Sequence, residues 1–147
     1  ILVHRIGGSE QVSGIEPAEA LLGFLEFAGK DPLVAYNAPF DETVLRRSLR
    51  QFLGLRLGAQ LRWLDLAFLA PALVDRSRVR VPLDYWLERY AIMPRQRHHA
   101  LADAGATARL LQIMLATAPA KGIATVAALI EAAQSESWVQ RASRQSL

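Results

Sequence analysis

The chain has 147 residues, 52% of them hydrophobic, and this length and composition fit one globular domain with a buried core and exclude a disordered segment. Its 17 Lys+Arg against 14 Asp+Glu give a net charge of +3, and 15 of the basic residues are arginine, which fits a phosphate-bearing partner or, equally, solvated helix faces. Because there is no cysteine, the sequence excludes disulfides, thiolate nucleophiles and cysteine-ligated zinc, which suits a cytoplasmic protein without requiring one.

Neither a membrane span nor a signal peptide is expected. The longest uncharged run near the C-terminus, residues 110–120, is far short of the ~20 apolar residues that cross a bilayer. The opening "ILVHRI" starts at Ile1 and lacks the charged start and small-residue cleavage site of a signal peptide. We therefore expect that the chain is trimmed at its front.

The first elements in chain order are a strand end, a helix and a strand. Residues 1–6 are short and β-branched, which favours the end of a strand, and a glycine-rich loop follows. The segment 16–30 repeats leucine at helical spacing, with Pro17 in its first turn and Gly29 as a cap, which predicts a helix. The apolar run "DPLVAYN", residues 31–37, is too short for a helix and predicts a buried strand.

The middle of the chain predicts a second helix, strand and helix. Residues 41–53 place apolar side chains on one side and three arginines on the other, so we expect an amphipathic helix that ends at Gly54. The segment 61–73, "LRWLDLAFLAPAL", divides into a strand that ends near Leu64 and a helix that begins at Asp65.

The last part of the chain is helical. A basic loop precedes the helix expected over residues 82–91, and a long helix follows over residues 100–117. A further helix is expected over residues 122–134, and the polar tail 134–147 is the segment expected to fray. Strands that alternate with helices predict a single α/β domain over residues 1–147 with a partly parallel sheet.

The residues present argue against several kinds of active site. His98 and His99 are adjacent, so they cannot both face one zinc ion from a regular helix, and the sequence contains no H-E-x-x-H. It also contains neither a G-x-S-x-G nucleophile elbow nor a G-x-x-x-x-G-K-[ST] phosphate loop. Carboxylates therefore remain as the candidate catalytic groups.

Two aspartates stand out by position. Asp41 closes "AYNAPFD" directly after the expected strand, and Asp103 lies in the first turn of the long helix. Each could simply stabilise a helix N-terminus. Alternatively, both project into one cleft and hold hard cations such as Mg²⁺, which prefer oxygen ligands. His98, one turn earlier, could then take a proton from a polarised water, although an exposed and idle histidine is the other reading.

Two segments resemble a known family. "LVAYNAPFDETVL" (33–45) is similar to the second motif, and "HHALADAGATARLL" (98–111) to the third motif, of the DEDDh 3'-5' exonucleases. This family includes the proofreading epsilon subunit of bacterial DNA polymerase III, ribonuclease T and oligoribonuclease, and has a ribonuclease H-like fold. The segment 61–73 resembles the strand and helix between the motifs. The resemblance covers roughly residues 15–117, and it is specific in placing a histidine five residues before the aspartate.

The resemblance implies both an activity and the residues that carry it. It implies that Asp41 and Asp103 are metal ligands and that His98 is the general base. Asn37 and Phe40 belong to the same motif as Asp41 and would shape the cleft or touch the terminal nucleotide. The implied reaction is hydrolysis of phosphodiester bonds at the 3' ends of single-stranded DNA or RNA, with two Mg²⁺ or Mn²⁺ ions as cofactors.

The sequence departs from the family pattern at several points. Tyr36 stands where the family often has histidine, and Asp65 matches a frequent family aspartate that is not a regular metal ligand, so we interpret Asp65 as a helix cap. The family's first motif, Asp-x-Glu on a strand that pairs beside "PLVAY", occurs nowhere in the chain. We therefore expect a ribonuclease H-like exonuclease fold that lacks its first strands, helix-rich with a small parallel sheet remnant, whose open edge favours self-association.

Three hypotheses about function stay open. In the first, the chain is most of an exonuclease domain of a longer enzyme, with little activity by itself because two carboxylates hold Mg²⁺ weakly. In the second, it is a degenerate relative that binds nucleic acid or a polymerase. In the third, it is a helical interaction domain. Arginines of the loop 76–80, with Arg95 and Arg97, could contact substrate phosphates or simply be solvated. The choice between DNA and RNA is left open.

Overall fold

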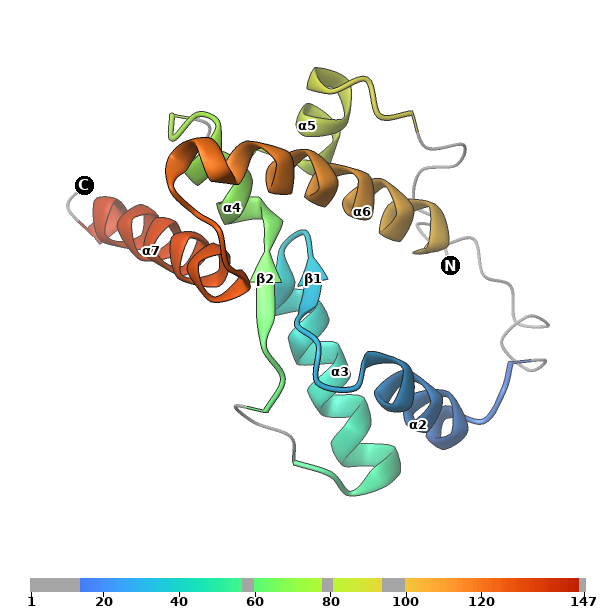
Figure 1. Cartoon of the computed structure of the whole chain (residues 1–147). Helices are drawn as coiled ribbons and strands as arrows, with labels where there is room; N and C mark the ends of the chain where they lie inside the picture. Colours follow the sequence, from blue (N-terminus) through green and yellow to red (C-terminus); the bar gives the residue numbers. More distant parts are fainter. Residues whose placement is uncertain (1–13, 57–59, 78–80, 94–99, 146–147) are drawn as a thin grey trace.

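The structure is a computed structural model, and it describes residues 14–56, 60–77, 81–93 and 100–145. Strands and helices alternate over the first half of the chain, and the second half is helical, as the sequence predicts (Figure 1). The elements are α2 (Pro17–Ala28), β1 (Leu33–Ala35), α3 (Ala38–Leu53), β2 (Trp63–Asp65), α4 (Leu66–Leu73), α5 (Leu83–Arg89), α6 (Ala100–Thr117), the 3-10 helix η1 (Ala118–Lys121) and α7 (Val126–Gln145).

The two strands form a small parallel sheet. Leu33 lies opposite Trp63, and Ala35 lies opposite Asp65, so the carboxyl ends of β1 and β2 meet at the same edge. Within the described ranges, β2 is the sole strand that pairs with β1. The expected helix-rich α/β architecture with a small parallel sheet is therefore confirmed. β1 itself is half-buried, whereas the sequence predicts a buried strand.

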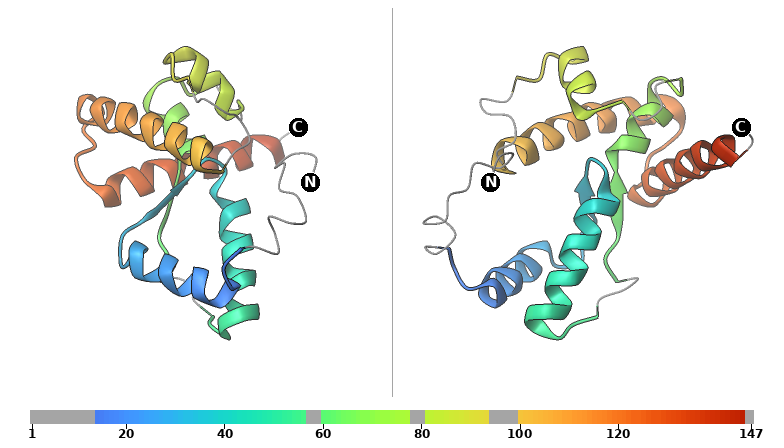
Figure 2. Two further views of the ribbon diagram at one scale, coloured as in Figure 1. Left: turned by 90° about the vertical axis from the view of Figure 1, so that its right-hand side faces the viewer. Right: turned by 180° about the vertical axis from the view of Figure 1, so that it is seen from behind.

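The hydrophobic core lies among α4, α5, α6 and α7, next to the sheet. Its fully buried side chains include, from α4, α5 and α6 in turn, Leu66, Leu69, Trp86, Leu110 and Met114. Figure 1 shows α4, α5 and α6 beyond the carboxyl ends of the strands and α7 beside β2, whereas α3 starts at that edge and runs back toward α2; the two views of Figure 2 show the same arrangement. Contacts of α4 with α6 and α7 hold this end together.

The other end of the molecule buries little apolar surface. Helices α2 and α3 pack against each other, but no residue of α2 is buried, and α3 buries Ala38 and Leu49. Phe27 is 90% exposed and Val44 is 50% exposed, although both helices have the apolar side that the sequence predicts. The helices are thus correctly predicted, but their apolar sides lack a covering layer within the part of the chain that is described.

Three helix boundaries differ from the sequence expectation, one of them the start of α7, which is Val126 and not residue 122. α3 begins at Ala38 and not at Asp41, so Asp41 is its fourth residue and lies in its first turn. α7 continues to Gln145, although the tail from residue 134 was expected to fray. It continues because Glu136 and Gln140, one turn apart, are buried and hydrogen-bonded to each other. Side-chain contacts that the polar composition does not reveal therefore extend this helix.

A sharp bend joins the two longest helices. The segments Ala100–Lys121 and Val126–Ser143 meet at 92°. Gly122 ends η1 with a φ of 74°, a left-handed conformation that favours glycine. In the described part of the chain, no single helix is long and apolar enough to cross a membrane. The bent pair meets both requirements only when its two helices are counted together.

Tyr36 ties the end of β1 to the segment before α5, and its removal is predicted to destabilise the fold. The Tyr36 hydroxyl donates a hydrogen bond to the Val81 carbonyl, and burial raises the pKa of Tyr36 to about 12. This folded-state pKa exceeds the ordinary value of 10.0. The contribution of the protonated Tyr36 hydroxyl to the free energy of unfolding is therefore complete below pH 10, and it is lost as the pH rises toward 12. We expect Tyr36→Phe to cost about 1 kcal/mol of unfolding free energy at neutral pH.

The measurement for Tyr36 is urea unfolding of both proteins at neutral and alkaline pH. The difference between wild type and Tyr36→Phe should shrink as the pH passes from 10 toward 12, because the ionised hydroxyl can no longer donate. A difference that stays constant over that range would contradict the assignment of the bond.

Candidate active site

Asp65 joins the two segments that follow the paired strands. Its Oδ1 accepts hydrogen bonds from the backbone N–H of Ala67, at 2.9 Å, and of Asn37, at 2.9 Å. Its Oδ2 accepts a third bond from the N–H of Ala38, at 3.1 Å. The predicted cap of α4 is thus confirmed, and the same carboxylate also holds the start of α3, which lies 27 and 28 positions earlier in the chain.

The turn between β1 and α3 has an unusual backbone. Asn37 has φ 69° and ψ 52°, which is the left-handed region, and asparagine tolerates this region better than most residues. It occupies the N-cap position of α3, but its side chain makes no capping hydrogen bond. The carboxylate of Asp65, at the end of β2, accepts hydrogen bonds at this helix start instead. This turn places Asp41 in the first turn of α3.

Asp41 and Asp103 line the same cavity, although they are 62 positions apart in the chain. The cavity has a volume of about 470 Å³ and lies beside the end of β1, where Ala35 and Tyr36 contribute to its wall. Thr107, one turn after Asp103, lines it as well and donates a hydrogen bond to the Asp103 carbonyl at 2.8 Å. Helix α3 thus supplies one carboxylate and helix α6 supplies the other.

The carboxylates near this cavity are partly removed from water. Burial raises the pKa of Asp41, and a hydrogen bond from its own backbone amide opposes the rise. Burial also raises the pKa of Asp65; the amides of Ala67, Asn37 and Ala38 lower it, and the negative charge of Asp41 raises it further. Negative charge that is partly desolvated in this way would be stabilised by a bound cation.

The described residues offer two carboxylates to a metal ion but no larger cluster. Oxygen ligands suit a hard cation such as Mg²⁺ or Mn²⁺, and the cavity is large enough for an ion that keeps several waters. Within residues 14–56, 60–77, 81–93 and 100–145, no group of three or more His, Asp and Glu side chains is placed to hold a metal. The two carboxylates are therefore the kind of ligand that Mg²⁺ or Mn²⁺ prefers, but they are few.

The remaining predicted site residues lie in different places. His98 and His99 fall outside the described residues, and α6 begins directly after them at Ala100. Phe40 is 66% exposed and lines an apolar cavity of about 420 Å³ that also touches Asp41. Asn37 lines a third cavity, of about 530 Å³, together with residues of α4 and α7. The structure thus brings Asp41 and Asp103 together, places Phe40 beside Asp41, and leaves Asn37 on another side.

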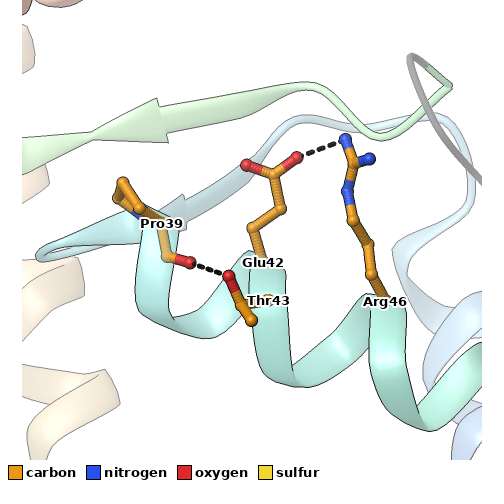
Figure 3. Close-up of polar contacts among 4 residues, drawn as sticks. All are labelled: Pro39, Glu42, Thr43 and Arg46. Atoms are coloured by element: carbon orange, nitrogen blue, oxygen red, sulfur yellow. Dashed lines mark hydrogen bonds and ion pairs between the residues drawn. The ribbon is translucent and has the colours of Figure 1, made fainter.

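Two arginines have carboxylate partners. Figure 3 shows Glu42 and Arg46 on successive turns of α3, with an ion pair between them. The Arg76 guanidinium lies 3.6 Å from the buried carboxylate of Glu136 on α7. The other arginines proposed as phosphate contacts fall outside the described residues: Arg78, Arg80, Arg95 and Arg97.

Two residues of this region have wider roles than the sequence predicts. Asp65 is expected to cap its own helix, but it also accepts bonds from the start of α3. Tyr36 is expected to be a mild departure from the family pattern, whereas it lines the carboxylate cavity and anchors Val81. The position of Asp65 at the end of a strand was the signal in the sequence for its wider role, because parallel strands end at a common edge and Asp65 therefore lies near the end of β1.

Comparison with known protein families identifies the chain. The family model RNase_T, described as an exonuclease, matches residues 2–111. The chain belongs to this exonuclease family. The family match contains Asp41 and Asp103 and ends within α6, so the whole of α7 lies beyond it. Membership of the exonuclease family supports nuclease function in general, and it agrees with the helix-rich α/β fold. Comparison with curated proteins and with solved structures gave no match.

Proposed function

We propose that this chain is a metal-dependent 3'-5' exonuclease domain of the DEDDh type, which hydrolyses phosphodiester bonds at the 3' ends of single-stranded DNA or RNA in the cytoplasm. The observation that carries the proposal is the cavity beside the end of β1, which Asp41 and Asp103 line together. Membership of the exonuclease family supports the class of reaction. Although Asp41 is exposed, desolvation raises the pKa of its carboxyl, and a bound cation would favour its charged form.

Each proposed residue has a distinct task. Asp41 and Asp103 would hold Mg²⁺ or Mn²⁺, which when bound polarises the scissile phosphate and lowers the pKa of the attacking water. His98 would take the proton from that water as general base. Phe40, beside Asp41, and Asn37 would contact the terminal nucleotide.

Residues 1–147 by themselves are predicted to hydrolyse DNA weakly, because two carboxylates position a cation poorly. The experiment incubates the chain with Mn²⁺ and a single-stranded DNA labelled at its 5' end. Stepwise shortening to a ladder of labelled fragments indicates attack from the 3' end, whereas early release of a labelled mononucleotide indicates attack from the 5' end. Vigorous digestion that disappears in His98→Ala would contradict the prediction of weak activity.

The coding sequence upstream of Ile1 provides an independent test. A strand with Asp-x-Glu encoded there would supply further carboxylates for the open edge of β1 and would favour the enzyme. In that case, the longer chain should digest single-stranded DNA at a rate that depends on Mg²⁺ and on Asp41.

The second candidate function is a binding module for nucleic acid or a polymerase, or a chain that associates with itself. It is favoured by the small number of metal-binding side chains in the described ranges. In this case Asp41→Ala would leave binding of single-stranded DNA unchanged, and replacement of exposed arginines such as Arg47 and Arg50 would weaken it. A fluorescence-anisotropy titration without divalent cations distinguishes these outcomes.

A further inference from the structure

We propose that Asp65 is a positioning residue of the metal site: its carboxylate holds the first turn of α3 and thereby sets the place of Asp41 relative to Asp103. The inference rests on the proposed function, because it concerns the same pair of carboxylates. Asp65 is assigned here neither as a metal ligand nor as a group that touches substrate. It acts through the backbone of a neighbouring element.

Two backbone amides at the start of α3 depend on Asp65 for a hydrogen-bond acceptor. The amides of Asn37 and Ala38 both donate to the Asp65 carboxylate. Pro39 has no N–H, and the Asn37 side chain makes no capping bond. Amides at the start of a helix need an acceptor from outside the helix. Asp65 therefore provides the acceptor where the helix itself provides none.

This bond network connects the sheet to the metal site. Asp65 is the last residue of β2 and lies in register with Ala35, the last residue of β1. From this edge its carboxylate fixes Ala38, and Asp41 follows three residues later, about one helical turn. The negative charge of Asp41 is near enough to raise the pKa of Asp65. A shift of the first turn of α3 would thus displace Asp41 from Asp103, which is carried by a different helix.

A purely local role for Asp65 makes a different prediction. The bond to Ala67 caps α4, so the loss of Asp65 also weakens α4 and the fold. Partial reversible unfolding raises the measured dissociation constant only by the reciprocal of the folded fraction, and it leaves the dissociation constant of the folded molecules unchanged. Displacement of Asp41 raises that dissociation constant, because groups that orient metal ligands typically change affinity by 10- to 100-fold. The dissociation constant, corrected for the folded fraction measured by circular dichroism, therefore separates the two roles.

The experiment measures Mn²⁺ binding to residues 1–147 by the electron paramagnetic resonance signal of free Mn²⁺. We compare wild type with Asp65→Ala and Asp65→Asn. Asp65→Ala should raise the dissociation constant by about 10-fold or more. Asp65→Asn should raise it less, since the amide oxygen can still accept two of the three bonds. Hydrogen exchange at Asn37 and Ala38 should accelerate in the same order.

The matched control is Asp75→Asn. Asp75 also accepts local bonds after a helix, from the Ser77 amide at 3.0 Å and the Ser77 hydroxyl at 2.7 Å. Neither of these two bonds reaches α3, so the Mn²⁺ dissociation constant should stay at the wild-type value. If Asp65→Ala does not fold, as judged by circular dichroism, Asp65→Asn decides the question.

Two patterns of results would overturn the inference, and they can be told apart. If both Asp65 variants keep the wild-type dissociation constant while Asp41→Asn raises it, Asp41 holds the cation without help from Asp65, and the proposed function stands. If Asp41→Asn also keeps the wild-type value, or if wild type binds no Mn²⁺, the metal site itself is wrong. The proposed function then fails together with the inference.

Discussion

Asp41→Asn and Asp103→Asn are each expected to weaken Mn²⁺ binding by at least about 10-fold, since loss of a direct ligand should cost no less than loss of a group that orients one. Both side chains line the cavity beside the end of β1, and each substitution keeps the shape of the side chain while removing its charge. In a protein that digests single-stranded DNA, each should lower the rate of hydrolysis by about 100-fold or more, because the bound cation contributes several kcal/mol to transition-state stabilisation. The measurements are Mn²⁺ titration and initial rates at saturating DNA.

Asp31→Asn is the control for these two variants. Asp31 is an exposed aspartate in the turn before β1, outside the walls of the carboxylate cavity. Its substitution removes the same charge at a position outside the cavity, so it tests whether net charge alone changes cation binding. Equal weakening in all three variants would mean that the Asp41 and Asp103 pair is not a specific site, and both aspartates would then return to the role of helix N-terminal stabilisers.

His98→Ala is expected to lower the hydrolysis rate by about 10²- to 10⁴-fold, the usual contribution of a general base, whereas His99→Ala should have a much smaller effect. The reason is spacing: His98 precedes Asp103 by five residues, as in the third motif of the exonuclease family, and His99 is displaced from it by one position. The rates are measured at saturating Mg²⁺ in a protein that includes any upstream Asp-x-Glu strand.

The two adjacent histidines serve as controls for each other. They have the same chemistry and adjoin each other in the sequence, so a change in net charge would affect both variants alike. Comparable losses from His98→Ala and His99→Ala would mean that the register of the motif is assigned wrongly. A large loss from His99→Ala alone would make His99 the base.

The aspartate variants test cation binding, and the histidine variants test proton transfer from water. The aspartate variants should change cation affinity together with rate, because they alter the site that holds the ion. The histidine variants should change the rate while cation affinity stays constant, since the proposed base takes a proton from water and is not a proposed ligand. A histidine variant that also loses Mn²⁺ would assign it as a ligand instead.

Local signals in the sequence were sufficient for most of the secondary structure. Pro17 and Gly29 delimit α2, and Gly54 ends α3 with a left-handed φ of 66°, as their residue types predict. The bounds of α6 were predicted correctly, and so was a small parallel sheet. These features depend on side-chain periodicity and backbone preference within a few neighbouring residues, which is information that a linear sequence contains.

The candidate site was predictable in part, through a motif and not through geometry. The spacing within "NAPFD" and "HHALAD" is enough to indicate Asp41, Asp103 and His98. Whether the two aspartates meet depends on how α3 and α6 pack around the end of β1. That packing is decided by contacts between segments far apart in the chain, and these contacts leave no local pattern.

The sequence by itself determined the family, the type of each element and the candidate carboxylates. The tertiary structure decided that Asp41 and Asp103 share a cavity, that α3 starts at Ala38, and that α7 continues through a polar tail. It also decided that Asp65 serves two helices at once, through hydrogen bonds to amides 27 and 28 positions away. The physical reason is that helix and strand preferences act between near neighbours, whereas hydrogen bonds and burial act through space.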